Sequence, residues 1–316
     1  MSRVRLCVRV GVRWGNDHVT TKQTGRILLI LPRAKAAQLE NQLDEIEQAL
    51  GPAGSVIREI ADDPDRMAMR IVELSNEVDQ VAVGGGDGTL SSVAPAFMQT
   101  GLPMVILPLG TANDLARTLG IPRDLIAAAE LARTGRLEDI DVGEVNGHTF
   151  YNAASIGLSV DVAERLEAGP KRYGVFSYLL TLLDLTRARR NFRAYVTCDG
   201  ELVTLNSIQL TVGNGVRHGG GVRVHADASI DDGRLDLYSL EPQPLWRLPI
   251  LFPAFMRGTH NAWRSVTNLR AREFHVETPA KPKRVNADGE IVSRTPATFK
   301  LHRNAVWVRL PPSVEP

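Results

Sequence analysis

The sequence predicts a two-part fold: a parallel α/β part first, then a β-rich, sandwich-like part. Three observations predict it. Strand and helix patterns alternate over residues 27–135, and short apolar strands paired around Asn-Gly and Asp-Gly follow from residue 139. The stretch Gly-Gly-Gly-Asp-Gly-Thr at residues 84–89 stands where a buried strand passes into a helix. Alternating strands and helices are typical of a parallel sheet covered by helices.

The first part contains four predicted strands, each followed by a helical pattern. The strands are expected at residues 27–31, 56–60, 80–83 and 104–107. Apolar residues at helical spacing predict a helix over residues 39–50 that Gly51 ends, and Asp63-Pro64 is a typical helix start. The glycine stretch opens the next helix, and shorter helices are expected at residues 112–119 and 124–134.

The second part is predicted to be mainly antiparallel. Asn146-Gly147 and Asp199-Gly200 each lie between alternating apolar segments, which is a strong hairpin signal. The expected strands are residues 139–145, 148–153, 192–198, 201–205, 207–212, 235–240, 273–277 and 305–310. Helices are expected at about 159–167 and 174–189.

Length and composition limit the class of protein. The chain has 316 residues, enough for one large domain or two ordinary ones. Its 37 basic and 36 acidic residues leave a formal net charge of +1, which argues against a nucleic-acid partner. Cys7 and Cys198, the only cysteines, suit a reducing compartment. No apolar run reaches the about 18 residues of a membrane span, and no secretory signal is visible, so a cytoplasmic protein is expected.

Residues 1–25 form a basic N-terminal extension. Apolar residues alternate with Arg3, Arg5, Cys7, Arg9, Gly11 and Arg13, which predicts a strand with one basic face. The extension is interpreted as an extra edge strand or as the product of an upstream start codon. The other interpretation is a basic strip for anionic lipid.

Residues 84–89 predict a phosphate-binding loop. A glycine-rich turn between a strand and a helix leaves backbone N–H groups free for an anion. The spacing differs from that of a dinucleotide-binding G-x-G-x-x-G, and no lysine follows as it does in a P-loop. Backbone amides and Mg²⁺ would therefore meet the phosphate charge, with Asp87 as an oxygen ligand. The alternative is a tight turn that binds nothing.

A second loop of similar character lies at residues 108–116. It is also expected at the carboxyl end of a strand, and in a parallel sheet the two loops share the edge where ligands bind. Thr111 or Asn113 could instead cap the following helix, and Asp114 suits the first turn of that helix.

Six motifs resemble, in order, the diacylglycerol kinase catalytic-domain family, which includes bacterial lipid kinases and is related to NAD kinases. They are GGGDGTL (84–90), PLGTANDLA (108–116), NAASIGLSVDVA (152–163), GNGVRHGGGVRV (213–224), ASIDDGRLDL (228–237) and DGE (288–290). The resemblance implies an NAD kinase-like nucleotide-binding domain at 26–138 and a lipid-substrate domain at 139–304, with the active site in the cleft between them. Residues 305–316 could return to the first domain.

The resemblance also implies a reaction, the transfer of the γ-phosphate of ATP, with Mg²⁺, to the hydroxyl of diacylglycerol or a related lipid alcohol. By position, the ATP-binding residues would be Gly85, Gly86, Asp87, Gly88, Thr89, Gly110, Thr111 and Asn113. Asp87 and Asp114 would complete the Mg²⁺ network, and Glu290 would be the general base. Taken alone, Asp288-Gly289 predicts a hairpin turn with Glu290 as a solvated strand residue. Replacing Asp87 or Glu290 by its amide is expected to abolish transfer with little effect on thermal stability.

A second, structural Mg²⁺ is present in some members of the family. Its ligands, mainly backbone carbonyls, would come here from Ser229, Asp232 and Arg234. The alternative is that Asp232-Gly233 is only a turn.

The chain departs from the family pattern after the first two strands. The family usually has Asn-Pro and a nearby glycine where this chain has Leu31-Pro32-Arg33-Ala34-Lys35, and it has a threonine near residues 60–62. Arg33 and Lys35 could supply charge in place of the missing contacts. The departure keeps open a degenerate protein that binds lipid or nucleotide without turnover. A kinase of a soluble substrate, of NAD kinase type, is the third interpretation.

A lipid kinase without a membrane span needs to dock on the membrane surface. Basic residues flank the apolar run 175–185, and an apolar group at 245–256 is followed by Arg257. Both segments predict peripheral membrane association, unless they pack over the β-rich domain. Exposed strand edges in the second part make a homodimer a further expectation.

Overall fold

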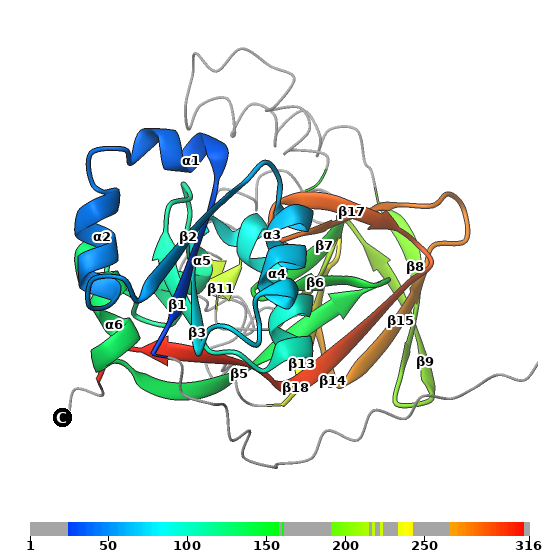
Figure 1. Ribbon diagram of the computed structural model, residues 1–316. Helices are drawn as coiled ribbons and strands as arrows, with labels where there is room; N and C mark the ends of the chain where they lie inside the picture. Colours follow the sequence, from blue (N-terminus) through cyan, green and yellow to red (C-terminus); the bar gives the residue numbers. More distant parts are fainter. Residues whose placement is uncertain are drawn as a thin grey trace, which may run out of the picture.

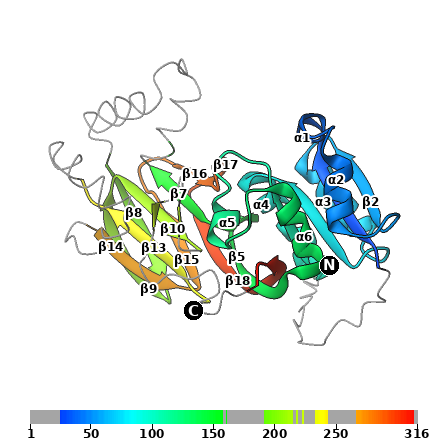
Figure 2. The same ribbon diagram turned by 90° about the vertical axis from the view of Figure 1, so that its left-hand side faces the viewer.

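The computed structural model describes residues 25–157, 160, 191–214, 217–218, 222–223, 233–242 and 266–312. Within these residues the chain forms a helix-covered lobe and a β-rich lobe (Figures 1 and 2). Some expected elements lie outside the described residues: the N-terminal extension, the helices at 159–167 (apart from residue 160) and 174–189, and the docking segments at 171–190 and 245–256.

Four parallel strands form the sheet of the first lobe. They are β1 (Ile27–Pro32), β2 (Val56–Ala61), β3 (Gln80–Gly85) and β4 (Met104–Pro108), in the order β2-β1-β3-β4. β1, β3 and β4 are buried over nearly all of their residues, as expected for parallel strands with both faces covered. The loops that follow all four strands therefore meet at one edge of the sheet.

Six helices accompany these strands. They are α1 (Arg33–Gln38), α2 (Leu43–Leu50), α3 (Pro64–Glu73), α4 (Asp87–Thr100), α5 (Asp114–Thr118) and α6 (Leu125–Thr134). α3 packs beside α4, and α2 packs beside α6 (Figure 1). Asp63 caps α3 by accepting the Arg66 N–H (2.8 Å), and Asp124 caps α6 by accepting the Ala127 N–H (2.9 Å).

The single helix expected at residues 39–50 is instead a turn followed by α2, with the unexpected α1 before it. The Leu43 N–H still bonds to the Leu39 carbonyl at 3.0 Å, and both leucines are buried. A four-residue spacing of buried leucines is thus compatible with a turn as well as with a continuous helix.

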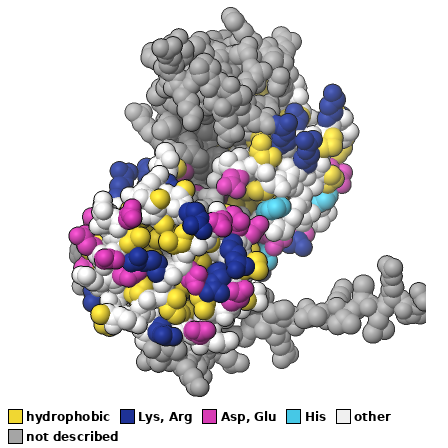
Figure 3. Space-filling model, turned by 45° about the horizontal axis from the view of Figure 1, so that its top comes forward, with side chains coloured by type: hydrophobic (Ala, Val, Ile, Leu, Met, Phe, Trp, Pro, Cys, Tyr) yellow, Lys and Arg dark blue, Asp and Glu magenta, His cyan; other side chains and the backbone are white. Residues whose placement is uncertain are grey.

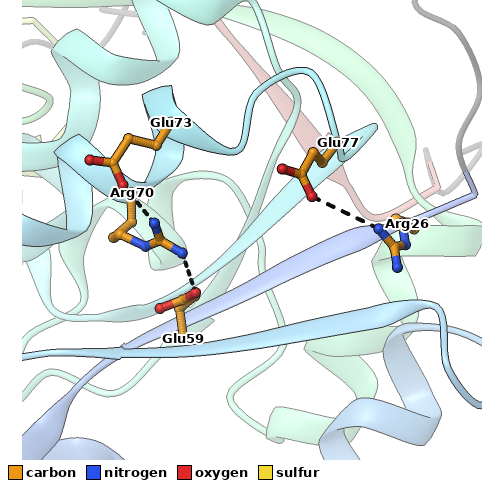
Figure 4. A network of polar contacts seen from close by, with 5 residues as sticks. All are labelled: Arg26, Glu59, Arg70, Glu73 and Glu77. Atoms are coloured by element: carbon orange, nitrogen blue, oxygen red, sulfur yellow. Dashed lines mark hydrogen bonds and ion pairs between the residues drawn. The ribbon is translucent and has the colours of Figure 1, made fainter.

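Ion pairs join α3 to the edge strand β2. The Arg70 guanidinium contacts Glu59 on β2 and Glu73 on its own helix (Figure 4). The hydrogen bonds that Arg70 donates to these carboxylates, the one to Glu59 above all, raise the pKa of Arg70 above its usual range. Arg26 lies 3.9 Å from Glu77 nearby. Over this lobe basic and acidic side chains are interspersed (Figure 3), so such pairs hold elements together without creating a field of one sign.

A ten-stranded sheet runs through both lobes because β18 (Ala297–Leu310) belongs to both of them. β18 pairs in parallel with β4 at Val308 and Met104, and antiparallel with β5 and β15. The remaining strands of this sheet are β5 (Arg136–Val145), β6 (His148–Phe150), β8 (Phe192–Cys198), β9 (Glu201–Ser207) and β15 (Glu273–Glu277). The strand expected at 305–310 is therefore the end of a much longer one.

A second, six-stranded sheet faces the first in the β-rich lobe. Its order is β14-β13-β10-β7-β16-β17. The strands are β7 (Ala153–Gly157), β10 (Gln209–Gly213), β13 (Leu235–Leu240), β14 (Val266–Ala271), β16 (Arg284–Ala287) and β17 (Glu290–Arg294). A separate pair is formed by β11 (Arg217–His218) and β12 (Val222–Arg223). Buried side chains of both sheets, Phe274 and Phe299 among them, form one core, which is the packing of a sandwich.

The two hairpin turns expected from the sequence are confirmed. Asn146 and Gly147 have φ values of 49° and 88°, and Asp199 and Gly200 have 49° and 85°. These left-handed values suit the tight turns that match strand twist. In the described part of the chain, no helix is long and apolar enough to cross a membrane.

Candidate active site

The glycine loop forms an open helix N-terminus at the edge of the parallel sheet. β3 ends at Gly85, Gly86 precedes the helix in extended conformation, and α4 begins at Asp87. The first helical bond runs from the Leu90 N–H to the Gly86 carbonyl at 3.0 Å. The N–H groups of Asp87, Gly88 and Thr89 precede it and have no partner within the helix. No side chain caps this end, so the geometry suits an anion.

The second loop touches the first, backbone to backbone. A Cβ on Gly110 would lie 2.5 Å from the Gly86 Cα, and the Leu109 N–H bonds to the Gly85 carbonyl at 2.9 Å. Neither Gly86 nor Gly110 has a positive φ. Glycine is therefore needed at these two positions partly for packing between the loops, since any side chain at either position would separate them.

Asp87 is the residue that joins the loops chemically. Its carboxylate accepts the N–H groups of Asp114 (3.0 Å) and Leu115 (2.9 Å), which open α5, and the Asn152 side-chain amide at 3.3 Å. Asp87 thus caps the start of α5, a role that the sequence suggested for Thr111 or Asn113. Asp114 is buried and lies 3.6 Å from Arg117.

Asn113 shapes its own loop. It has a φ of 49°, its side-chain oxygen accepts the Gly110 N–H (2.8 Å), and its amide donates to the Gly110 carbonyl (2.9 Å). Its side chain makes no capping bond to α5. Thr111 is exposed beside it. The roles of Thr111 and Asn113 toward a phosphate stay predictions.

Glu290 comes to this site from the β-rich lobe. It is the first residue of β17, which begins beside α4 (Figure 1). A Cβ on Gly88 would lie 2.5 Å from the Glu290 Oε1. The tertiary structure therefore brings Glu290 against the first turn of α4, at Gly88, across about 200 residues of sequence.

Asp288 is a functional candidate that the sequence predicts only as a turn residue. It does form the β16–β17 turn, with φ values of 45° for Asp288 and 98° for Gly289. Its carboxylate, however, turns inward and accepts bonds from Ser91, Tyr151, Asn152 and Ala153.

Burial raises the pKa of Asp288 to about 6, and the nearby Asp87 charge adds to the rise, while the hydrogen bonds from Ser91, Tyr151 and Ala153 oppose it. No local signal could have found this role, because Asp-Gly is already explained by the hairpin. Asn152 opens one of the six motifs, but the motif alone gives it no role, and its bond to Asp87 comes from the tertiary structure.

The carboxylates at the site suit a metal ion that is bound mainly by the phosphates of a nucleotide and only partly by the protein. Among the described residues no group of three or more His, Cys, Asp or Glu side chains is placed to hold an ion. Mg²⁺ bound to substrate phosphates needs only one or two protein carboxylates, and Asp87 stands at the open helix end. Of the second predicted metal site, Ser229 and Asp232 lie outside the described residues. Arg234 is exposed, next to Gly233, whose N–H bonds to Asp141 at 2.9 Å.

The two positions at which the chain departs from the family pattern face each other. Arg33 follows β1, Asp62 follows β2, and their side chains form an ion pair at 2.6 Å. Both side chains are largely exposed, at 69% and 73%. The pair lies at the same sheet edge as the two glycine loops.

Comparisons with known proteins agree along nearly the whole chain. A family model described as "Diacylglycerol kinase catalytic domain" matches residues 26–145. A model described as "YegS C-terminal NAD kinase beta sandwich-like domain" matches residues 152–310.

Relatives of this chain carry names of the same kind. A "Probable lipid kinase YegS-like" of Pseudomonas aeruginosa (strain PAO1) is 36% identical over 303 residues, which cover 90% of this chain and 94% of that protein. A "Diacylglycerol kinase" of Mycobacterium tuberculosis (strain H37Rv) is 30% identical over 240 residues, covering 74% and 77%. A crystal structure of a diacylglycerol kinase from Bacillus anthracis str. Sterne has a TM-score of 0.69 at 23% identity. The match covers 92% of this chain and 98% of that one. This last likeness shows the fold.

Proposed function

This chain belongs to the diacylglycerol kinase catalytic-domain family and is a lipid kinase, and on that premise we propose the reaction that its site performs. The γ-phosphate of ATP, with Mg²⁺, passes to the hydroxyl of diacylglycerol or a related lipid alcohol. The observation that carries this proposal is the position of Glu290, a carboxylate of one lobe set against the open helix N-terminus of the other.

The phosphates would be held by the first turn of α4. The N–H groups of Asp87, Gly88 and Thr89 point out of the helix start, and the helix dipole adds partial positive charge there. The contact between Gly86 and Gly110 keeps the second loop beside this turn. Since the loop has no lysine, Mg²⁺ held by Asp87 would supply the missing positive charge to the phosphate oxygens when it is bound.

The acceptor hydroxyl would lie between Glu290 and the phosphate. The Glu290 side chain is exposed to the solvent side of the site, so an alcohol can approach it. As general base, Glu290 would accept the proton of that hydroxyl while the oxygen attacks phosphorus. Phosphoryl transfer depends mainly on alignment and charge stabilisation, so this carboxylate has to lie within hydrogen-bond reach of the hydroxyl when it accepts the proton.

The lipid would be reached at a membrane surface, by a cytoplasmic protein that associates peripherally. This part of the proposal rests on the basic and apolar segments at 171–190 and 245–256, which lie outside the described residues. Direct binding to vesicles with and without anionic lipid tests it, with stronger binding to anionic vesicles expected.

The reaction is tested with labelled ATP, Mg²⁺ and a panel of acceptors. Diacylglycerol, ceramide and sphingosine are offered in mixed micelles, and NAD is offered in solution. Transfer to a lipid alcohol supports the proposal. Binding of ATP or lipid without transfer would favour a degenerate protein, the interpretation that the departure from the family pattern at Arg33 and Asp62 keeps open. Transfer of label to NAD would favour a kinase of a soluble substrate.

A further inference from the structure

We propose that Asp288 is a positioning residue for phosphoryl transfer, which locks the turn carrying Glu290 onto α4 and so sets where Glu290 meets the reacting hydroxyl. The inference rests on the proposed function, because it assigns the role of Asp288 through Glu290. Asp288 itself touches none of the reacting groups in this scheme.

The carboxylate of Asp288 joins three elements. Its Oδ2 accepts the Ser91 hydroxyl of α4 at 2.6 Å and the Tyr151 N–H at 2.7 Å. Its Oδ1 accepts the N–H groups of Asn152 and Ala153, each at 3.1 Å. The β16–β17 turn is thereby fastened both to the phosphate-binding helix and to the connection between β6 and β7.

The turn itself does not need these bonds. Asp199-Gly200, at the β8–β9 turn, has the same left-handed conformation, with φ values of 49° and 85° against 45° and 98° for Asp288-Gly289. An Asp-Gly pair therefore makes this kind of turn from local preference alone. What distinguishes Asp288 is the set of four donors gathered around its carboxylate.

The same contacts reach the phosphate loop. The backbone of Asn152 donates to Asp288, and the side chain of Asn152 donates to Asp87 at 3.3 Å. Asp87 in turn holds the start of α5. One connected set of hydrogen bonds thus positions the proposed base and the acid of the phosphate loop relative to each other.

Loss of the carboxylate would leave its donors unmatched. An asparagine at 288 keeps the size but turns an NH₂ group toward two N–H or O–H donors, so at least one side of the clamp opens. The turn then becomes more mobile, and Glu290, which it carries, is no longer held in one place relative to the reacting hydroxyl. A misplacement of about 1 Å can lower a rate by on the order of 10²-fold.

The test is a double-mutant cycle on kcat. Asp288→Asn is expected to lower kcat by about 10- to 100-fold while the KM for ATP stays within about twofold. Because Asp288 acts through Glu290, the same substitution should lower kcat little further in a Glu290→Gln background. Ser91→Ala, which removes one donor, should give a smaller loss with the same dependence on Glu290. Asp199→Asn is the matched control and should change neither kcat nor KM.

Three results would overturn the inference while the proposed function stands. They are full kcat in Asp288→Asn, a loss that repeats undiminished without Glu290, and a loss that merely follows the fraction unfolded in a thermal melt. If Asp288→Asn does not fold, the Ser91→Ala cycle decides by the same criteria. Absence of transfer to any lipid by the wild-type protein would instead overturn the proposed function, and the positioning role with it.

Discussion

Glu290 occupies the space that a side chain on Gly88 would fill: a Cβ at residue 88 would lie 2.5 Å from the Glu290 Oε1. The two residues belong to different lobes, and their contact defines where the second lobe closes on the first turn of α4. Gly88 is needed here for room, because its φ is not in the left-handed region.

Gly88→Ala is therefore expected to lower kcat by at least about 10-fold with little loss of stability. The added methyl group displaces the end of a flexible glutamate, and alanine is the better helix former by about 1 kcal/mol in a helix interior. Steady-state kinetics and a thermal melt measure the two effects. Gly51→Ala is the matched control, since its Cβ would lie 2.5 Å from the Ser55 Oγ, outside the site. Unchanged kcat in Gly88→Ala would contradict the assigned position of Glu290.

Asp87→Asn and Glu290→Gln should both lower kcat to a small residual rate, by about 10²- to 10⁴-fold for loss of a general base, but they should differ in stability. The carboxylate of Asp87 holds two backbone N–H groups of α5, and its amide cannot replace both acceptors. In place of the small effect expected from the sequence, Asp87→Asn should lower the free energy of unfolding by about 1–2 kcal/mol. Glu290 is exposed, so Glu290→Gln should change it by less than about 0.5 kcal/mol. Urea unfolding separates the two, and equal destabilisation would argue against the Asp87 contacts.

Arg33→Ala is expected to raise the KM for ATP by about 3- to 10-fold while stability stays nearly constant. The pair of Arg33 with Asp62 is largely exposed, and such pairs contribute at most about 1 kcal/mol. We expect the charge at this sheet edge to act on the nucleotide instead. Arg26→Ala is the control, since Arg26 precedes β1 and its pair with Glu77 is also exposed. An unchanged KM in Arg33→Ala would show that the pair has no part in binding ATP.

Titration of Asp288 should make the protein less stable but more active as the pH rises. Its pKa is about 6 in the folded protein against an ordinary value of 3.8. Between these values the folded protein holds a proton that the unfolded chain has released, so this group's contribution to the free energy of unfolding falls as pH rises from about 4 to 6. Transfer should instead fall below about pH 6, because a protonated carboxyl cannot accept all four donors.

The stability part of this expectation is measured as the difference between wild type and Asp288→Asn. Urea unfolding at several pH values from 4 to 7.5 gives the free energy of unfolding of both proteins. The value for the wild type minus that for Asp288→Asn should fall as pH rises. The groups acting on Asp288 include Asp87, whose charge raises its pKa, and the hydroxyl of Ser91. A flat difference would mean that Asp288 titrates like an exposed carboxylate.

Much of the fold could be predicted because its signals are local. Apolar runs identified β1, β3 and β4, Asp63 and Asp124 marked helix starts, and Asn146-Gly147 and Asp199-Gly200 marked hairpins. In each case neighbouring residues decide the conformation through backbone preference or a capping bond. The break between α1 and α2 was missed because buried leucines four residues apart fit both arrangements.

The sequence by itself determined the glycine loop at a strand-to-helix junction, the parallel part followed by the β-rich part, and the family to which the chain belongs. The family resemblance implied that Glu290 lies at the site and that residues 305–316 could return to the first domain, but the contacts themselves come from the tertiary structure: β18 joins β4, Glu290 meets Gly88, and Asp288 turns inward to Ser91. These contacts join residues about 200 positions apart. They depend on how two packed lobes close on each other, and no local spacing or propensity carries that information.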